Sequence, residues 1–216
     1  MQKGQFFVLD GVDGSGKGEQ IKLLKEKLPQ LYPDREFVFT REPGGSPYAE
    51  QMRVLMLNNI YAKDASGEVM IQLFGAARFD HLGKIVFPAL NAGKVVISDR
   101  FDGSTYAYQI MAQQGGYLAQ KFFRLQRRLI CEMLPSWSTI ILDVDTAIAM
   151  SRRGGRTGQE STHFDEREAA FHEAVRRGFR SYVREYLSPD MAIVDAGRTI
   201  EEVHQDILAL FRDKLG

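Results

Sequence analysis

The sequence predicts a three-layer α/β fold, in which helices flank a five-stranded parallel sheet. Two observations predict it. Short runs rich in β-branched and aromatic residues alternate with longer segments of helical periodicity, which is typical of parallel strands joined by crossover helices. A glycine-rich loop directly follows the first of these runs. The predicted strands are residues 5–9, 37–40, 95–98, 139–144 and 191–195.

The composition of the 216 residues limits the function classes. Hydrophobic residues make up 44% and charged residues 26%, which suits one well-packed domain over residues 1–216. Lys and Arg together equal Asp and Glu, so the net charge gives no general attraction to nucleic acid or to a membrane surface. The single cysteine, Cys131, excludes an internal disulfide, and we expect it to be buried on a helix. The first apolar run is too short for a signal peptide, so we expect a cytoplasmic protein.

Charged side chains stand at the carboxyl ends of four predicted strands. They are Asp10, Arg41, Asp99 and Asp145. In a parallel sheet these ends border the ligand crevice. We expect the four side chains to lie along one edge of the sheet.

Two later segments carry strong helix signals. Apolar residues at three- and four-residue steps predict a helix over about residues 166–187. Thr199 and Glu202 form a capping box, which predicts that a terminal helix begins there. Residues 151–163 lack apolar periodicity and are rich in glycine and arginine, which favours a lid that closes over anions.

The stretch GVDGSGKG, residues 11–18, matches the phosphate-binding pattern G-x-x-x-x-G-K but not its final serine or threonine. Its glycines allow successive backbone N–H groups to point inward, and Lys17 adds a positive charge for the outer phosphates. The loop therefore predicts the P-loop NTPase fold. The residues expected to bind the ATP phosphates are Gly11, Asp13, Gly14, Ser15, Gly16, Lys17 and Gly18.

Gly18 stands where the pattern normally has serine or threonine. That hydroxyl usually contacts Mg²⁺, but magnesium readily keeps several water ligands. We expect water to fill the place, with Asp10 or Asp99 holding the ion indirectly. The glycine should weaken metal placement without abolishing phosphate binding.

Further motifs extend this match along nearly the whole chain. They are LDGVDGSGK at 9–17, TREPGG at 40–45, LFGAAR at 73–78, SDRFDGSTYAYQ at 98–109, FHEAVRRGF at 171–179 and VDAGRTIEEV at 194–203. Together they resemble the thymidylate kinase family, the P-loop kinases that phosphorylate dTMP to dTDP. The resemblance implies ATP as donor, Mg²⁺ as cofactor and dTMP as acceptor, and it allows a homodimer formed through helices.

The resemblance implies a role for each matching side chain. Asp13 would face the deoxyribose 3′-hydroxyl, and Arg41 and Arg100 would hold the acceptor phosphate. Asp99 would help to position magnesium. The residues implied for the base are Phe74, stacked on the ring, Arg78 at its 4-keto oxygen, and Thr105 and Gln109 at its N3–H.

The spacing of the base residues agrees with these roles. Phe74 and Arg78 are four positions apart, as are Thr105 and Gln109, so on helices each pair would share a face. At cytosine, an arginine donor would meet an amino group instead of the 4-keto oxygen and stay unpaired, which favours thymine or uracil. Whether the 5-methyl group is required stays open.

The lid departs from the family pattern, because His163 stands where an arginine is expected. Arg153 or Arg156 is expected to cover the transferring phosphoryl group instead, and the two stay open as alternatives. The residues expected to act in catalysis are Lys17, Arg41, Arg100, Arg153 and Arg156.

Two other functions stay open as alternatives. The stretch GVDGSGKGEQIK also resembles the loop of type 2 polyphosphate kinases, but these do not explain TREPGG or AYQ. The other alternative is a nucleotide-binding protein without activity. The retained Lys17, Asp99, Arg100 and Arg41 argue against it, because a pure binder would not need so many groups around two phosphate sites.

Overall fold

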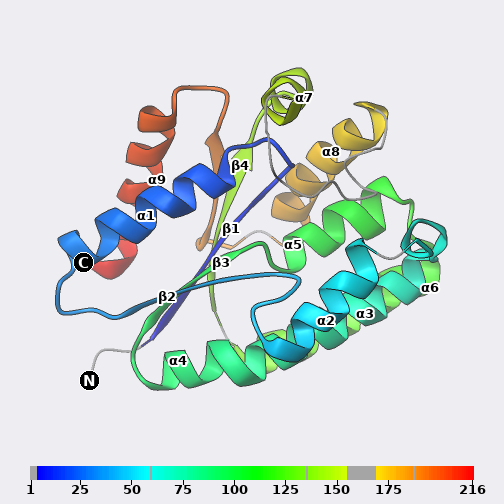
Figure 1. The fold of residues 1–216 in the computed structure, drawn as a ribbon, viewed down its shortest axis with the longest axis horizontal. Helices are drawn as coiled ribbons and strands as arrows, with labels where there is room; N and C mark the ends of the chain where they lie inside the picture. The colour runs from blue at the N-terminus through cyan, green and yellow to red at the C-terminus, as the bar shows by residue number, and fades with distance from the viewer. Residues whose placement is uncertain (1–3, 59, 135, 155–168, 187) are drawn as a thin grey trace.

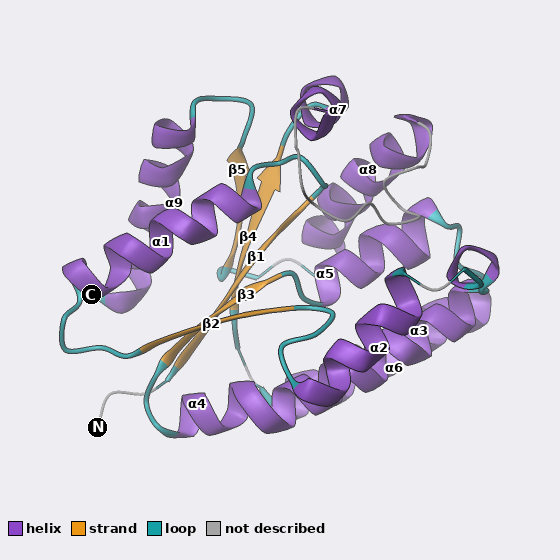
Figure 2. Ribbon diagram, viewed as in Figure 1, coloured by secondary structure: helices purple, strands orange, loops and turns teal. Residues whose placement is uncertain are grey.

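The computed structural model describes residues 4–58, 60–134, 136–154, 169–186 and 188–216. A five-stranded parallel sheet runs through this part of the chain in the order β2-β3-β1-β4-β5 (Figure 2). Its strands are β1 (Gln5–Gly11), β2 (Phe37–Arg41), β3 (Val95–Asp99), β4 (Ser138–Asp143) and β5 (Met191–Asp195). The predicted fold class and the predicted strands are confirmed, with ends shifted by at most about two residues.

Helices connect the strands and cover both faces of the sheet. Helices α1 and α9 lie on one face, and α2 to α6 lie on the other (Figure 1). The helices are α1 (Lys17–Leu31), α2 (Pro47–Leu57), α3 (Gly67–His81), α4 (Phe87–Asn91), α5 (Asp102–Thr105), α6 (Tyr117–Met133), α7 (Thr146–Gly154), α8 (Ala169–Glu185) and α9 (Ile200–Leu215). A 3-10 turn, η1 (Ala62–Asp64), precedes α3, and the π-helical turns η2 (Leu82–Val86) and η3 (Tyr106–Ala112) continue α3 and α5.

Strand β1 lies at the centre of the sheet and is apolar on both of its faces, because helices cover it from both sides. Phe7 stacks on Phe211 of α9, with ring centroids 4.3 Å apart. The neighbouring Phe6 makes an edge contact with Phe101, with centroids 5.2 Å apart. The run QFFVL therefore shows no polar alternation, and the glycine-rich loop leaves the buried core at the carboxyl end of β1.

The strand register brings the charged strand ends together. Asp99 of β3 pairs with Leu9 of β1 on one side and with Arg41 of β2 on the other. Asp10 follows Leu9 directly, so three of the four side chains expected at this edge stand on neighbouring strands. The fourth, Asp145, lies two residues beyond β4.

The predicted helix signals hold where the structure describes them. Thr199 Oγ1 accepts from the Glu202 N–H at 3.3 Å, and the Glu202 carboxylate accepts from the Thr199 N–H at 3.0 Å, which completes the capping box. The helix predicted over 166–187 is α8, described from Ala169 to Glu185. The expectation for Cys131 was wrong, because α6 turns it to the solvent. Within the described ranges, no helix is long and apolar enough to cross a membrane.

Candidate active site

The phosphate loop joins β1 to α1 and depends on its glycines. Gly11, Gly14 and Gly16 have positive φ angles of 141°, 87° and 91°, which side chains other than glycine rarely allow. A Cβ at Gly14 would lie 2.2 Å from the carbonyl oxygen of Ala149, and one at Gly11 would lie 2.5 Å from that of Leu142. The loop therefore packs closely against β4 and α7 and leads directly into the N-terminus of α1, where anions bind favourably.

Lys17 is buried beneath this loop. Its Nζ donates to the carbonyl oxygens of Gly11 at 2.8 Å and of Val12 at 2.9 Å. Burial, and next the charge of Arg100, lower the pKa of Lys17 to about 8 against the opposing effect of Asp13. The lysine is thus a cation held inside the loop, at the position where the sequence predicts phosphate binding.

Asp10 is fully buried at the end of β1. Its carboxylate accepts from the N–H groups of Gly11 (3.0 Å), Phe101 (3.4 Å) and Ser104 (3.0 Å), and from the Ser104 hydroxyl (2.6 Å). Burial raises the pKa of Asp10 to about 6, although Arg100 and Ser104 lower it. Asp10 therefore connects the start of α5 to β1. Donors of the chain itself already occupy the hydrogen-bond acceptor positions of its carboxylate.

Asp99 differs from Asp10 in this respect. Its Oδ1 is buried and has no hydrogen-bond partner within the described residues. A buried acceptor of this kind needs an explanation, and an ion held through water would supply one. Of the two carboxylates predicted for magnesium, Asp99 is the one that fits.

The region offers no ready-made metal cage. Among the residues described, His, Cys, Asp and Glu side chains do not gather in a group of three or more that could hold a metal ion. Gly18 is exposed at the start of α1, and a Cβ there would meet no atom within 4 Å. A magnesium ion at this place would take most of its ligands from water and phosphate oxygens.

Arg100 connects the end of β3 to the phosphate loop. Its guanidinium pairs with Asp13, donates to the Gly11 carbonyl oxygen at 3.0 Å and to Ser104 Oγ at 2.9 Å, and adopts a left-handed backbone with φ 74°. Tyr108 donates to the other oxygen of Asp13 at 2.6 Å. Burial raises the pKa of Asp13, but Arg100 and Lys17 outweigh it and hold that pKa well below its usual range. A positive φ is uncommon at a residue other than glycine and costs free energy, so the contacts of Arg100 with Asp13, Gly11 and Ser104 must hold it in this conformation.

Two further arginines stand beside Arg100. Arg41, at the end of β2, is half-exposed and pairs with Glu50 of α2 at 2.9 Å. Arg53, one turn further along α2, donates to the carbonyl oxygen of Pro43 at 2.9 Å. Burial, and next the charges of Arg41 and Arg100, lower the pKa of Arg53. The three guanidiniums therefore lie close enough to repel one another, as they would around a phosphate.

Two of the predicted base residues, Arg78 and Thr105, contact each other and form a buried wall. Arg78 of α3 is buried and donates from Nη2 to Thr105 Oγ1 at 2.9 Å, so the structure brings these two predicted residues into contact. Gln109 is also buried, and its Nε2 has no partner within the described residues. Phe74 is half-buried on α3, four residues before Arg78. The orphaned amide of Gln109 fits a base that presents polar atoms to this wall.

The helical face assumed for Thr105 and Gln109 needs a correction. Thr105 ends α5, and Gln109 lies in the π-helical turn η3 rather than in an α-helix. The Gln113 N–H donates to Tyr108 O at 2.9 Å, a bond to the fifth residue back. Because each turn here holds more residues than in an α-helix, the four-residue spacing no longer establishes that the two side chains share a face.

The segment predicted to form a lid, residues 151–163, is described only up to Gly154. Arg153 near the end of α7 is half-buried and donates to Nε2 of His172 at 2.9 Å. Its charge also contributes to lowering the pKa of Asp13, so it lies near the phosphate loop. Arg156 and His163 lie outside the described residues.

The sequence analysis missed three residues of this site. Tyr108, inside the AYQ motif, holds Asp13. Arg53 stands three positions after Glu50, a spacing that places both on one face of α2. Arg152 donates to the carbonyl oxygen of Ala196 at 2.8 Å and so ties the base of the lid to the turn after β5. Spacing could have found Arg53 and Tyr108, but nothing local in the sequence reveals the contact of Arg152.

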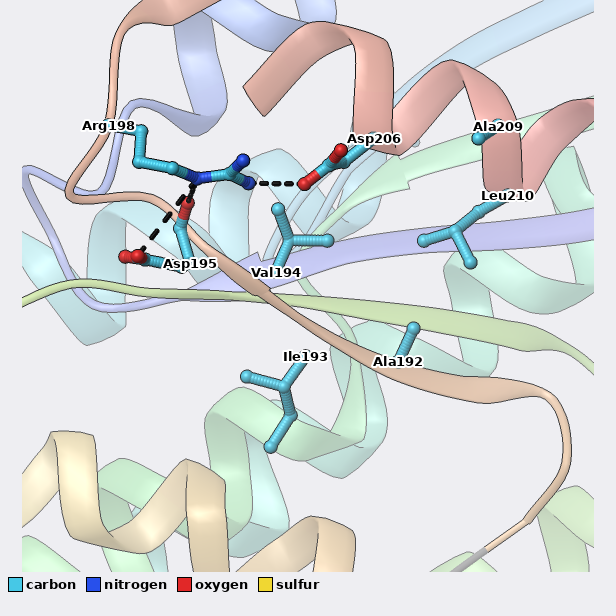
Figure 3. Close-up of a pocket in the computed structure, with 8 residues that line it drawn as sticks. All are labelled: Ala192, Ile193, Val194, Asp195, Arg198, Asp206, Ala209 and Leu210. Atoms are coloured by element: carbon cyan, nitrogen blue, oxygen red, sulfur yellow. Dashed lines mark hydrogen bonds and ion pairs between the residues drawn. The ribbon is translucent and has the colours of Figure 1, made fainter. Parts of the chain in front are cut away.

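A separate hollow of about 410 Å³ lies between β5 and α9 (Figure 3). Arg198 pairs with Asp206 beside it, and Ala192, Val194 and Leu210 are among the apolar residues that line it. None of the residues predicted for phosphate or base binding lines it. This hollow is therefore not the place where the phosphates meet.

The fold and the site together define the class of protein. A glycine-rich loop between a central strand and a helix, with buried Lys17, with Arg100 in contact with the loop and with Arg41 at the end of β2, is the arrangement of a P-loop kinase. The comparisons with known proteins identify the family. The thymidylate kinase family model matches residues 9–207. The chain belongs to the thymidylate kinase family, and its activity is that of a nucleoside monophosphate kinase.

Relatives match over nearly the full length. The chain is 39% identical over 212 residues to a thymidylate kinase from Symbiobacterium thermophilum, which covers 97% of this chain and 94% of that protein. It is 40% identical over 204 residues to one from Ruegeria pomeroyi, covering 94% and 92%. Its fold is similar to the crystal structure of thymidylate kinase from Ehrlichia chaffeensis, with a TM-score of 0.71 at 28% identity over 97% of this chain and 99% of that one.

Proposed function

We propose that the protein transfers the γ-phosphoryl group of ATP to dTMP and so supplies dTDP for dTTP synthesis. The observation that carries this proposal is the arrangement of two sites around Asp99. On one side of Asp99, β1 leads into the phosphate loop with Lys17, and on the other side β2 ends at Arg41. Arg100 follows Asp99 and contacts the loop. Glu42, the residue after Arg41, accepts from Arg78, so the wall formed by Arg78 and Thr105 joins the Arg41 side. The two phosphates of donor and acceptor would meet between them.

Phosphoryl transfer to a nucleotide monophosphate requires that the negative charges of the two phosphates be neutralised, and it does not require a general base. A nucleotide monophosphate has a second pKa near 6, so the acceptor is already a dianion at pH 7. Lys17 would bind the outer phosphates of ATP, and Arg41, Arg53 and Arg100 would hold the acceptor phosphate in line. Arg153, or Arg156 beyond the described residues, would cover the transferring group.

The sugar and the base would be read by the opposite wall. Asp13 would accept from the 3′-hydroxyl, since Tyr108 and Arg100 already orient its carboxylate. Phe74 would stack on the ring, and Arg78 would donate to the 4-keto oxygen. Gln109 would pair with the N3 edge, which would satisfy its buried amide.

The residues present fit a magnesium ion, because Asp99 offers a buried acceptor without a partner in the described chain. Asp99 would hold the ion through water, and Asp10 would keep the α5 segment beside it. When bound, the ion would neutralise phosphate charge next to Lys17. Arg41 and Arg100 would still provide the alignment of the acceptor.

We further propose a homodimer through the outer face of α6. The buried face of this helix carries Phe123 and Ile130, whereas Leu118, Leu125 and Leu129 are exposed on the rest of its surface. Leucines of this kind, repeated along one helix, suit a symmetric interface. The cytoplasmic location expected from the sequence stays a prediction.

Formation of ADP and dTDP by the purified protein tests the proposed function. dTMP, dUMP, dCMP and thymidine are offered in turn with ATP and Mg²⁺, and polyphosphate replaces ATP in a parallel series. We expect the fastest turnover with dTMP and ATP. Turnover only with polyphosphate would establish the other donor, and tight dTMP binding with no turnover from either donor would establish a protein that binds without catalysis.

A further inference from the structure

A buried chain of hydrogen bonds runs from β2 to the base wall through His81. Thr40 Oγ1 lies 2.7 Å from His81 Nε2, and His81 Nδ1 lies 3.0 Å from Glu42 Oε1. The other carboxylate oxygen, Glu42 Oε2, accepts from Arg78 Nε at 2.7 Å. His81, Glu42 and Arg78 are all nearly inaccessible to solvent. None of the contacts described for phosphate binding uses His81.

The partners of the ring assign its tautomer. The Glu42 carboxylate can only accept, so Nδ1 carries the hydrogen and donates to Oε1. In the neutral ring, Nε2 then accepts from the Thr40 hydroxyl. The ring therefore has two different contacts, one to a carboxylate and one to a strand end.

The backbone above the ring leaves it little room. A Cβ at Gly45 would lie 2.7 Å from His81 Cδ2 and 2.8 Å from Nε2, and Gly45 has φ 84°. The loop of residues 42–45 therefore rests directly on the imidazole. A ring held by Thr40, Glu42 and this loop has one orientation.

Arg78 depends on that orientation through Glu42. Arg78 donates to Glu42 with Nε and to Thr105 with Nη2, so the carboxylate fixes the plane of the guanidinium. Without the Nδ1 donor, the Glu42 carboxylate could rotate. The guanidinium of Arg78 would then shift as well, because its Nε donates to that carboxylate. Displacements of about 1 Å at a reading group can cost about a hundredfold in efficiency.

We propose that His81 is a positioning residue that sets base selectivity: its Nδ1 holds Glu42, and Glu42 holds Arg78 against the base. This inference rests on the proposed function, because it assumes that Arg78 reads the 4-keto oxygen. His81 acts through Glu42 and does not touch the substrate. The same ring also joins the base wall to Thr40, the residue before Arg41, and so connects base reading with the acceptor-phosphate site.

Two substitutions separate the two ring nitrogens. In His81→Asn the amide nitrogen stands near the place of Nδ1, and in His81→Gln it stands near the place of Nε2. Both variants leave a polar amide in the same buried space, so they serve as controls for each other. Thr40→Val removes only the hydroxyl that faces Nε2.

The readouts are kcat and KM for dTMP, kcat/KM for dCMP, KM for ATP, and the free energy of unfolding in urea. We expect His81→Asn and Thr40→Val to keep the preference for dTMP over dCMP within about threefold of the wild type. We expect His81→Gln to lose about 10- to 100-fold of that preference, mostly through KM for dTMP and with KM for ATP unchanged.

Three results would overturn the inference. Equal losses of preference in His81→Asn and His81→Gln would show that Nδ1 has no special part. Losses that follow the free energy of unfolding and raise KM for ATP and dTMP alike would reduce His81 to a structural residue. An unchanged preference for dTMP over dCMP in His81→Gln would also show that His81 does not set base selectivity.

The wild type separates this inference from the proposed function. If the wild type turns over dTMP and the His81 variants show the same preference for dTMP over dCMP, only the proposed role of His81 is rejected. If it does not turn over dTMP, calorimetric binding of dTMP and dCMP to the same variants decides the selectivity question. Absence of dTMP binding to the wild type would remove both proposals.

Discussion

Arg100 pairs with Asp13, a residue of the phosphate loop 87 positions earlier in the chain. The family resemblance implies that Arg100 holds the acceptor phosphate and that Asp13 faces the deoxyribose, and in the structure these two residues are in contact with each other. Tyr108 holds the second oxygen of Asp13. In the proposed complex, the acceptor would share Arg100 with Asp13, and Tyr108 would help to keep Asp13 in place.

Tyr108→Phe tests this arrangement. The substitution removes one hydrogen bond to a charged group, and we expect about a tenfold rise in KM for dTMP with little change in KM for ATP. Steady-state kinetics with each substrate varied in turn measures it. Tyr117→Phe, an exposed tyrosine on α6, is the control and should change neither KM. An equal rise for both substrates would contradict a role in holding the acceptor sugar.

Arg78→Ala should weaken dTMP far more than ATP. We expect about a hundredfold or greater loss in kcat/KM for dTMP, since a site built to hydrogen-bond a substrate is left unpaired. The buried Glu42 also loses its partner, so the free energy of unfolding should fall by about 3–5 kcal/mol. Arg128→Ala, which removes an exposed arginine of α6, is the control for both readouts. Equal losses for the two nucleotides would take Arg78 out of base reading.

ATP binding should weaken as pH rises through about 8. Lys17 has its pKa lowered from 10.5 to about 8, and phosphates bind its charged form. Affinity for ATP, measured by calorimetry between pH 7 and pH 10, should fall by up to about tenfold per pH unit above that value. Lys17→Arg keeps its charge throughout, so any ATP binding it retains should not show this decline.

The sign of the linkage separates this loss from unfolding. The folded pKa of Lys17 lies below its unfolded value, so the buried charge costs stability below about pH 8, and that cost disappears as pH rises toward 10.5. The Lys17 contribution to the free energy of unfolding therefore increases over this window. A fall in affinity that follows loss of folded protein would contradict the assignment to Lys17.

Gly18→Ser should lower the magnesium concentration needed for half-maximal turnover. The position is exposed, and an added Cβ would meet no atom within 4 Å, so the hydroxyl can be introduced without strain. We expect a shift of about two- to tenfold, and no shift for Gly18→Ala, which adds the Cβ alone. If serine and alanine give the same magnesium dependence, the missing hydroxyl does not matter in this protein.

Gly178→Ala should destabilise the protein. A Cβ at Gly178 of α8 would lie 2.8 Å from the Cα of Ala107 in η3, so one segment must move. We expect a loss of about 1–3 kcal/mol in the free energy of unfolding, measured in urea, together with a higher KM for dTMP because η3 carries Gln109. Gly83→Ala is the control, since a Cβ there would meet nothing within 4 Å. A fully stable Gly178→Ala would contradict the close packing of α8 on η3.

The strands, the phosphate loop and the last helix could be predicted because their signals are local. The apolar run before Asp10, the glycines after it and the Thr199 capping box each lie within a few residues of the element that they define. Cys131 was predicted to be buried, but it lies on the exposed side of α6. The residues of one helical turn do not show which side of the helix the neighbouring elements cover.

The rest of the site depends on contacts between distant residues. Glu42 lies 36 positions from Arg78, and 39 positions from His81, so no spacing rule joins them. The tie from Arg152 to Ala196 spans 44 positions. Such contacts arise because α3 brings Arg78 and His81 to the segment after β2, and α7 brings Arg152 to the turn after β5. They appear only when the sheet is assembled.

Because of the π-helical turn η3, the number of residues between Arg100 and Gln109 matters for the proposed base site, as well as the types of those residues. Between Arg100 and Gln109 the chain must fill α5 and then a turn that is wider than an α-helical one. A homologous sequence that lacked one residue here could keep every named side chain and still point Gln109 in a different direction. When other chains are aligned with this one, an ungapped match from Asp99 to Gln109 is therefore a stricter criterion for pyrimidine recognition than the count of identical residues.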